Sequence, residues 1–374
     1  MLSKLSLVDS NAKNKATTRR TEDDRLDYIR TARVKEDALQ SLNTLWARLQ
    51  HEDYDTVTII EDFVSSNGIP KLLEFLMQKN NVADPKCVSA ATLVLIEFLF
   101  LADQKTKKSK TRKLGYQMAR EFVKRKGIRV FLKNMLLLKF EERNSLALGN
   151  IWRVLGRVIN KRTLRFMDRQ EQLIVIDAAN FCFYEIGRLD DSTRQENWVE
   201  YILRPLLFAV GNTVSDTTTF TKEDFLQKGV VGMSLGALKG YGDDRYTENK
   251  TVLENALYIF TTASTNGLLS SEEDLVLILP FCKHSLAMSK RGSRRNIRQD
   301  KEICKNDIKI ALDSLRLLEQ ASSKVALDSI EKFCLLEACA SFVKSCYYGE
   351  DESIELQARA VMRKITSRKH AISD

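Results

Sequence analysis

The chain has 374 residues, 44% of them hydrophobic, and its 59 lysines and arginines outnumber its 50 aspartates and glutamates. This composition is sufficient to bury a sizeable core. Only 15 glycines and 4 prolines punctuate it, too few for a protein of many strands, so its Leu-, Lys- and Glu-rich segments predict an all-α fold.

The net charge of +9 is unevenly distributed along the chain. It is concentrated in residues 1–20 and in two short runs, Lys105 to Lys113 and Lys290 to Arg298, and the remainder is mildly acidic. This distribution argues against a continuous basic groove of the kind that nucleic acid requires. Residues 1–25 are expected to form a disordered basic tail, and a mitochondrial or plastid targeting peptide is the alternative. No apolar run approaches the length that crosses a bilayer.

From residue 26 to residue 370 the apolar periodicity predicts one domain of helices grouped in threes. An apolar sequence motif at the start of the third helix, such as Ile69-Pro70-Lys71-Leu72-Leu73, recurs near residues 128, 203 and 278. Each group is apolar on more than one side, as around Trp152, so only stacked neighbours can bury that surface. The expected helices are 32–50, 54–66, 69–80, 85–102, 113–126, 128–139, 144–161, 169–189, 196–212, 222–240, 248–266, 272–289, 302–321, 325–347 and 352–368.

The clearest repeat signal lies between Ser65 and Phe100. Gly68-Ile69-Pro70 opens a short helix with an apolar face, and Asp84-Pro85 supplies an N-cap and a first-turn proline for a longer helix that contains Ala90 and Ala91. This pattern resembles the armadillo repeat. The resemblance implies a right-handed α-solenoid of about five armadillo-like three-helix units, with a concave groove that holds extended peptides. HEAT-like helix pairs and an irregular helical bundle are the alternative architectures.

On this resemblance, residues along the third helices are the candidates for peptide binding. They are Lys71, Glu74, Gln78, Arg129, Lys133, Glu200, Arg204, Phe208 and Asn212. Exposed residues of solvated helices would show the same pattern. The nuclear-import adaptors, which are armadillo proteins, use a repeated Trp with an Asn four residues later, and Trp46, Trp152 and Trp198 lack that Asn.

A basic run between two of the expected helices is the second candidate site. Its cations are Lys105, Lys107, Lys108, Lys110, Arg112 and Lys113. They repel one another, which favours an extended, solvated loop. Such a run is typical of a nuclear localisation signal or an anchor for phosphates or acidic peptides, and equally of a solvated loop or the start of a surface helix.

The sequence carries no recognisable signature of catalysis, metal binding or cofactor binding. His51, His284 and His370 are far apart, and none has a partner at metal-ligand spacing. The glycines at 236, 240 and 242 match neither phosphate-loop spacing. Seven cysteines without a Cys-x-x-Cys pair are typical of buried thiols in a reducing compartment. We therefore expect no enzyme activity and no cofactor.

These patterns together predict a non-catalytic protein-interaction scaffold or adaptor in the cytoplasm, the nucleus or both. Cations outnumber carboxylates among the groove candidates, so the expected partner is an extended acidic or phosphorylated peptide. The alternative is a nuclear-transport or nucleic-acid-associated factor whose basic loops contact phosphates.

Overall fold

The computed structural model describes residues 35–50, 56–78, 81–103, 109–188, 199–215, 219–239, 250–269, 271–289, 301–345 and 352–373. These residues are helical apart from short turns and include no strand, which confirms the all-α prediction for them. None of the described helices is both long and apolar enough to cross a membrane. The expected N-terminal tail and the basic run at 290–298 lie outside the described residues.

The elements have the following bounds. They are α2 Lys35–Gln50, α3 Thr56–Ser65, α4 Gly68–Met77, α5 Pro85–Asp103, α6 Ser109–Lys124, α7 Gly127–Leu137, η2 Glu142–Asn144, α8 Ser145–Val158, η3 Leu164–Phe166, α9 Arg169–Arg188, η4 Val199–Leu203, α11 Arg204–Thr213, α12 Lys222–Gln227, α13 Val230–Lys239, α14 Lys250–Thr265, α15 Glu272–Ser289, α16 Lys301–Lys324, α17 Leu327–Lys332, α18 Leu335–Ser345 and α19 Glu352–Ser373.

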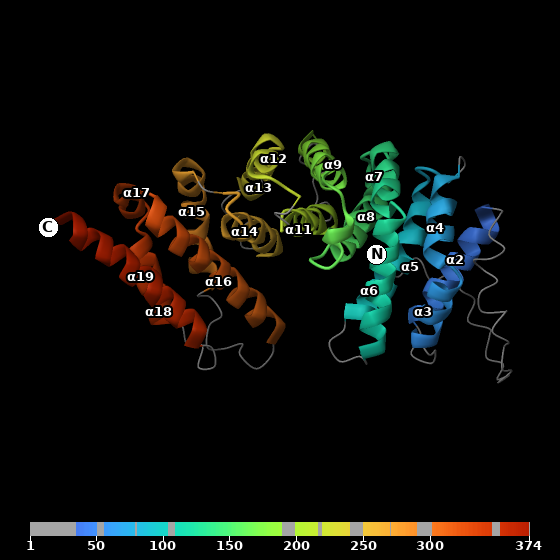
Figure 1. Cartoon of the computed structure of the whole chain (residues 1–374), viewed down its shortest axis with the longest axis horizontal. Helices are drawn as coiled ribbons and strands as arrows, with labels where there is room; N and C mark the ends of the chain where they lie inside the picture. Colours follow the sequence, from blue (N-terminus) through green and yellow to red (C-terminus); the bar gives the residue numbers. More distant parts are fainter. Residues whose placement is uncertain are drawn as a thin grey trace.

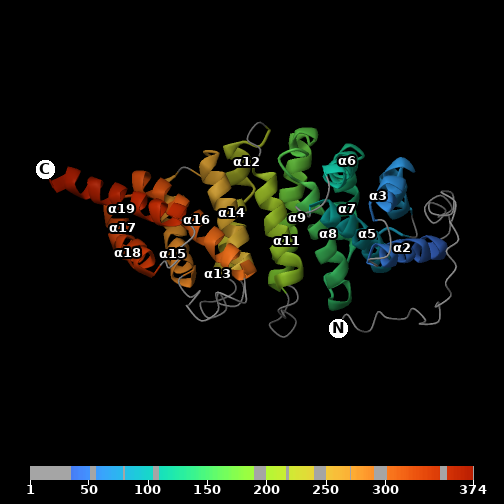
Figure 2. The same ribbon diagram turned by 90° about the horizontal axis from the view of Figure 1, so that it is seen from below.

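The helices form an elongated molecule in which α2 lies near one end and α19 at the other (Figures 1 and 2). Two rows of helices run along it. In the first row, α2, α5, α8, α11, α14, α16 and α19 each pack against the next. In the second row, α4, α7, α9, α13, α15 and α18 do the same. Helices α3 and α6 contact each other; α3 also contacts α4, and α6 also contacts α4, α5, α7 and α8.

Hydrogen bonds between successive units show the length of the structural repeat. The Asn134 Oδ1 accepts from the Ala83 N–H, 51 residues away. The Asn212 Nδ2 donates to the Gly156 carbonyl across 56 residues, and the Asn255 Nδ2 donates to the Arg204 carbonyl across 51 residues. Asparagine side chains therefore connect each of these units to the preceding one.

The expected grouping into threes matches α2–α4 and α5–α7 but not the helices that follow. From α8 onward each first-row helix is followed by one principal second-row helix, and the short α12 and α17 precede α13 and α18. The apolar motif that starts at Leu203 leads into α11, a first-row helix, and the motif that starts at Ile278 lies inside α15. The apolar motif is a local signal for a helix, whereas packing decides to which row that helix belongs. The expected register is therefore wrong after the second unit.

Two of the expected long helices are each broken into a short and a longer helix. The segment 222–240 forms α12 and α13 on either side of Gly229, whose φ is 66°. The segment 325–347 forms α17 and α18 around Cys334, whose φ is 50°. A positive φ cannot continue a right-handed helix, and glycine adopts it without steric cost.

The two N-terminal units share a local motif at the turn before their last helix. Asn67 and Lys126 adopt φ values of 57° and 60°, and Gly68 and Gly127 follow them directly. A Cβ at Gly68 would lie 2.5 Å from the Phe63 ring, and a Cβ at Gly127 would lie 2.8 Å from the Phe122 ring. The recurrence of Gly-Ile in the sequence thus reflects a phenylalanine that packs against the glycine five residues later.

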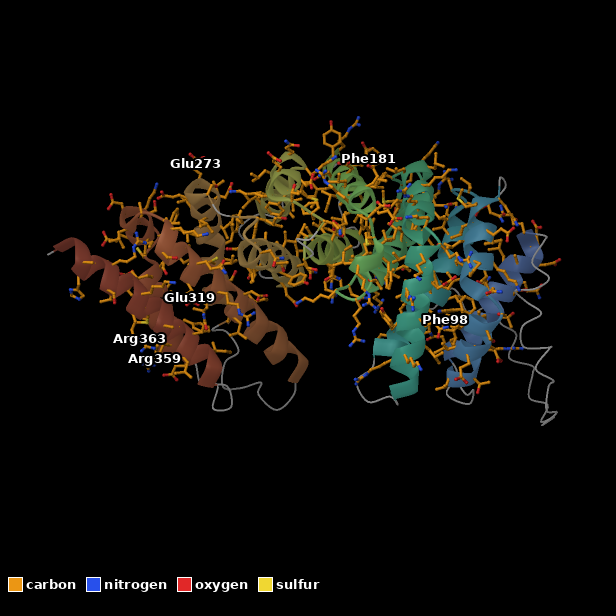
Figure 3. The ribbon with its side chains drawn as sticks, viewed as in Figure 1. Phe98, Phe181, Glu273, Glu319, Arg359 and Arg363 are labelled. Carbon is orange, nitrogen blue, oxygen red and sulfur yellow. The ribbon has the colours of Figure 1, made fainter. Side chains whose placement is uncertain are left out.

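Trp152 of α8 lies at the centre of the core, as expected. Its side chain is completely buried, together with Leu148, Leu155 and Ile159. Phe98 of α5 lies toward the N-terminal end of the molecule (Figure 3). Its ring packs against that of Phe63 of α3, with ring centroids 4.7 Å apart. One apolar core thus extends through the described helices.

Replacing Trp152 by Ala should lower the free energy of unfolding by about 3–5 kcal/mol, because it removes a fully buried indole from a packed core. Urea unfolding followed by circular dichroism measures this change. A loss below about 1 kcal/mol, typical of surface substitutions, would contradict the packing described for α8.

A buried carboxylate connects the start of α9 to the start of α12. Asp224 accepts from the Arg169 Nη2 at 2.7 Å and from the Arg169 Nε at 3.0 Å. It also forms a capping box with Thr221, whose Oγ1 accepts from the Asp224 N–H. The Arg169 guanidinium is the main cause that lowers the pKa of Asp224 to about 2, and the Thr221 backbone N–H and hydroxyl add to it.

The stabilisation from ionised Asp224 should be complete above its unfolded pKa of 3.8 and should be lost as the pH falls through its folded pKa of about 2. The wild type should therefore be more stable than an Asp224→Asn variant at pH 6, and the difference should shrink between about pH 4 and pH 2. Urea midpoints of both proteins across this range test the expectation. A difference that does not change with pH would show that the carboxylate charge contributes nothing.

Candidate functional site

The groove candidates from the sequence do not lie in one row of helices. Lys71 and Glu74 lie on α4, Gln78 directly follows α4, and Arg129 and Lys133 lie on α7, all in the second row. Arg204, Phe208 and Asn212 lie on α11 in the first row, and Glu200 lies in η4, which contacts α8, α11 and α14. The expectation of one groove lined by all nine residues is wrong, because α11 is not equivalent to α4 and α7.

Arg129 has a structural role, because it pairs with two carboxylates of the protein. Its guanidinium lies 3.6 Å from a Glu171 carboxylate oxygen and 3.8 Å from Asp168, and the Lys126 ammonium lies 3.1 Å and 3.4 Å from the same two carboxylates. The Glu171 side chain is fully buried. These cations therefore fasten α7 to the start of α9 and compensate a buried charge.

Asn212 also has a structural role. It is 8% exposed, and besides donating to the Gly156 carbonyl it accepts from the Tyr258 hydroxyl at 3.0 Å. One asparagine thus joins α8, α11 and α14. Because its amide nitrogen already donates a hydrogen bond and its amide oxygen already accepts one, we do not assign Asn212 to ligand binding.

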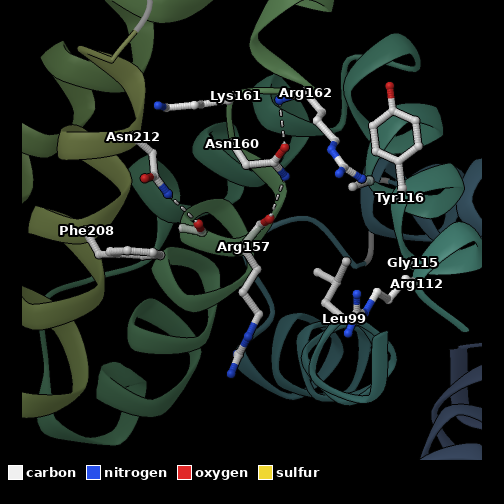
Figure 4. A pocket seen from close by; sticks show the side chains of 12 residues that line it. Leu99, Arg112, Gly115, Tyr116, Arg157, Asn160, Lys161, Arg162, Phe208 and Asn212 are labelled. Carbon is white, nitrogen blue, oxygen red and sulfur yellow. Dashed lines mark hydrogen bonds between the residues drawn. The ribbon is translucent and has the colours of Figure 1, made fainter. Parts of the chain in front are cut away.

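Two adjoining cavities open along the first row. One of about 700 Å³ lies between α5, α6, α8 and α11, and one of about 420 Å³ lies between α5, α8, α11 and α14. They share Gly156, Arg157 and Phe208, so they form one continuous concavity, the basic groove. Figure 4 shows Phe208 and Tyr116 on opposite sides of the larger cavity.

Two glycines of α8 shape this groove. A Cβ at Gly149 would lie 2.5 Å from the Tyr201 carbonyl oxygen, and a Cβ at Gly156 would lie 2.9 Å from the Phe208 ring. The glycines are two helical turns apart on one face of α8 and allow η4 and α11 to approach it closely. Phe208 is thereby held in the wall of the groove, where it remains 37% exposed.

Cations dominate the lining of the groove. Arg112, Arg153, Arg157, Lys161, Arg162 and Arg204 line it, and among the described residues that line it Glu254 is the only carboxylate. The distribution of charge along the sequence, which argued against a continuous basic groove of the kind that nucleic acid requires, does not indicate this convergence. Packing gathers cations from α6, α8, α11 and the connection after α8, which are dispersed along the sequence.

The arginines of α8 lie over aromatic rings. The Arg153 guanidinium carbon is 5.0 Å from the Tyr201 ring centroid, and that of Arg157 is 5.8 Å from the Phe100 centroid. Both rings are partly exposed, and Arg153 and Arg157 are four residues apart on one helical face. Cation–π contact restricts the orientation of both guanidinium groups.

The sequence contained a signal for this site that was missed. Arg153 and Arg157 interrupt the apolar pattern of α8, and Lys161 continues their four-residue spacing just beyond its end. A helix buried almost all round has only a narrow exposed strip, and cations at this spacing indicate where that strip lies.

The basic run that was expected to be a loop is partly helical. Helix α6 begins at Ser109, so Lys110, Arg112 and Lys113 belong to it. Arg112 lines the groove and Lys113 is exposed. Lys105, Lys107 and Lys108 lie outside the described residues, as does the side chain of Lys110.

Four of the described cysteines, Cys87, Cys182, Cys282 and Cys339, are free and buried. Burial raises the pKa of Cys182 and of Cys339 to about 12, which keeps both thiols protonated and unreactive at neutral pH. Within the described part of the chain, no group of three or more His, Cys, Asp or Glu residues could hold a metal ion.

No protein-family model matches this chain, and no curated protein sequence is similar to it.

Proposed function

We propose that the protein is a non-catalytic interaction scaffold that binds an extended acidic or phosphorylated segment in the basic groove. Its stacked helices would form a right-handed α-solenoid, armadillo-like in the three-helix units α2–α4 and α5–α7 and built from helix pairs thereafter. The observation that carries the proposal is the convergence of six cations in one concavity, whose described lining residues include one carboxylate. A groove of one sign of charge concentrates ligands of the opposite sign.

The shape of the groove favours an extended ligand. It runs across four first-row helices, from α5 to α14. Several carboxylates in succession could each meet a different arginine, and bidentate Arg–carboxylate contacts provide geometric specificity as well as charge. Phe208 and Leu99 add apolar lining between the cations.

The aromatic contacts make the arginines suitable for recognition. A guanidinium group that already lies over a ring loses less conformational freedom on binding than a solvated side chain does. The rings themselves are then less available for stacking with nucleobases, on which binding of single-stranded nucleic acid depends. This favours an acidic protein segment over RNA or DNA as the ligand.

Charge reversal at Arg157 and Arg204 should weaken binding of an acidic peptide by about 30-fold or more, because two charge-assisted contacts become repulsive. A fluorescein-labelled peptide library with Glu or Asp fixed at alternate positions is the probe, and fluorescence polarisation measures the affinity. Both residues line the smaller cavity, and Arg204 is exposed, so folding should be retained.

The matched control for this experiment is Lys133→Glu/Lys324→Glu. It reverses two charges at exposed positions on α7 and at the end of α16, neither of which lines the groove. The control should bind the library like the wild type. Equal binding by the Arg157→Glu/Arg204→Glu variant and the wild type would overturn the proposal.

A further inference from the structure

We propose that the groove ends in a seat for a phosphate group, formed by Arg120, Lys124, Arg162 and Arg165, the cation cluster. This inference rests on the proposed function and specifies it, because the bound segment would then carry a phosphorylated serine or threonine next to its acidic residues.

The cluster is built around two aromatic side chains. The Arg120 guanidinium carbon lies 5.1 Å from the Phe166 ring centroid, the Lys124 ammonium 5.3 Å and the Arg165 guanidinium carbon 4.8 Å from it. The guanidinium carbon of Arg162 lies 5.9 Å from the ring of Tyr116. Two separate elements, α6 and the connection between α8 and α9, thus contribute cations to one site.

These charges have no carboxylate partners among the described residues. The neighbouring acidic groups are engaged elsewhere, because Glu121 pairs with Arg125 at 2.7 Å and Asp168 pairs with Lys126 and Arg129. Three of the four cations surround a single ring, so any two of them lie within about 10 Å, roughly one screening length at moderate salt. A multivalent anion would relieve the repulsion between them.

The cluster is continuous with the basic groove. Tyr116 and Arg162 both line the larger cavity, and Tyr116 accepts a hydrogen bond from the Arg165 Nη2 at 2.7 Å. A segment that lies in the groove can therefore extend past Tyr116 onto the cluster. All four cations are exposed, and thus accessible to such a segment.

The chemistry of the cluster suits a phosphomonoester better than a carboxylate. A phosphorylated side chain carries between one and two negative charges at neutral pH and three acceptor oxygens. Three or four convergent cations can satisfy those oxygens at once, whereas a carboxylate offers one charge and two oxygens. The faces of Phe166 and Tyr116 are in contact with cations, which disfavours stacking of a nucleobase there.

The test compares two labelled peptide libraries that are identical except for one central residue, phosphoserine in the first and serine in the second. The wild type should bind the phosphorylated library about ten-fold more tightly or better. An Arg120→Gln/Arg165→Gln variant should bind both libraries equally, at the affinity of the wild type for the serine library. Lys133→Gln/Lys324→Gln, which removes the same charge elsewhere, should keep the preference.

The outcomes separate this inference from the proposed function. Equal binding of both libraries by the wild type would overturn the phosphate seat, and so would a preference that persists in the Arg120→Gln/Arg165→Gln variant. In either case the proposed function would stand if binding still required Arg157 and Arg204. Binding of neither library would overturn both. A uridine-rich oligonucleotide that competes more strongly than the phosphopeptides would overturn the seat in favour of a nucleic-acid site.

Discussion

The close approach of α11 to α8 is the contact on which both the stack and the groove depend. It exists because α8 presents glycines where side chains would collide, at Gly149 against the Tyr201 carbonyl and at Gly156 against the Phe208 ring. Asn212 reinforces it through the Gly156 carbonyl. Loss of this approach would separate the first row in mid-chain and would remove Phe208 from the wall of the groove.

Charged side chains are held in two kinds of contact. Ion pairs fasten second-row helices to their neighbours, as where Lys126 and Arg129 meet Glu171 and where Arg169 meets Asp224. Along the groove and the cation cluster, by contrast, cations lie over aromatic rings, as with Arg153 on Tyr201 and Arg165 on Phe166. A cation over a ring is held in place by attraction to the ring, which itself carries no net charge.

The sequence predicted local structure well where its signals were local. Helices α2 to α9 lie within a few residues of the expected bounds, apart from the earlier start of α6, and the paired turns at Gly68 and Gly127 were recognised as a repeat. It predicted the site only in part, because the candidates included Arg112, Arg204, Phe208 and Asn212, which line the groove. Arg129 was chosen for its position on a third helix and proves to pair with Glu171, whereas Arg157, which lines both cavities, was not chosen.

By itself, the sequence determined that the chain is helical, where most helices begin and end, and that they must stack to bury their apolar faces. Only the tertiary structure decided which helices share a row and which cations face one groove. The physical reason is distance along the chain. Caps, turns and helical periodicity act over a few residues, whereas the contacts that define the rows join residues 51 to 56 positions apart, and no local pattern encodes that pairing.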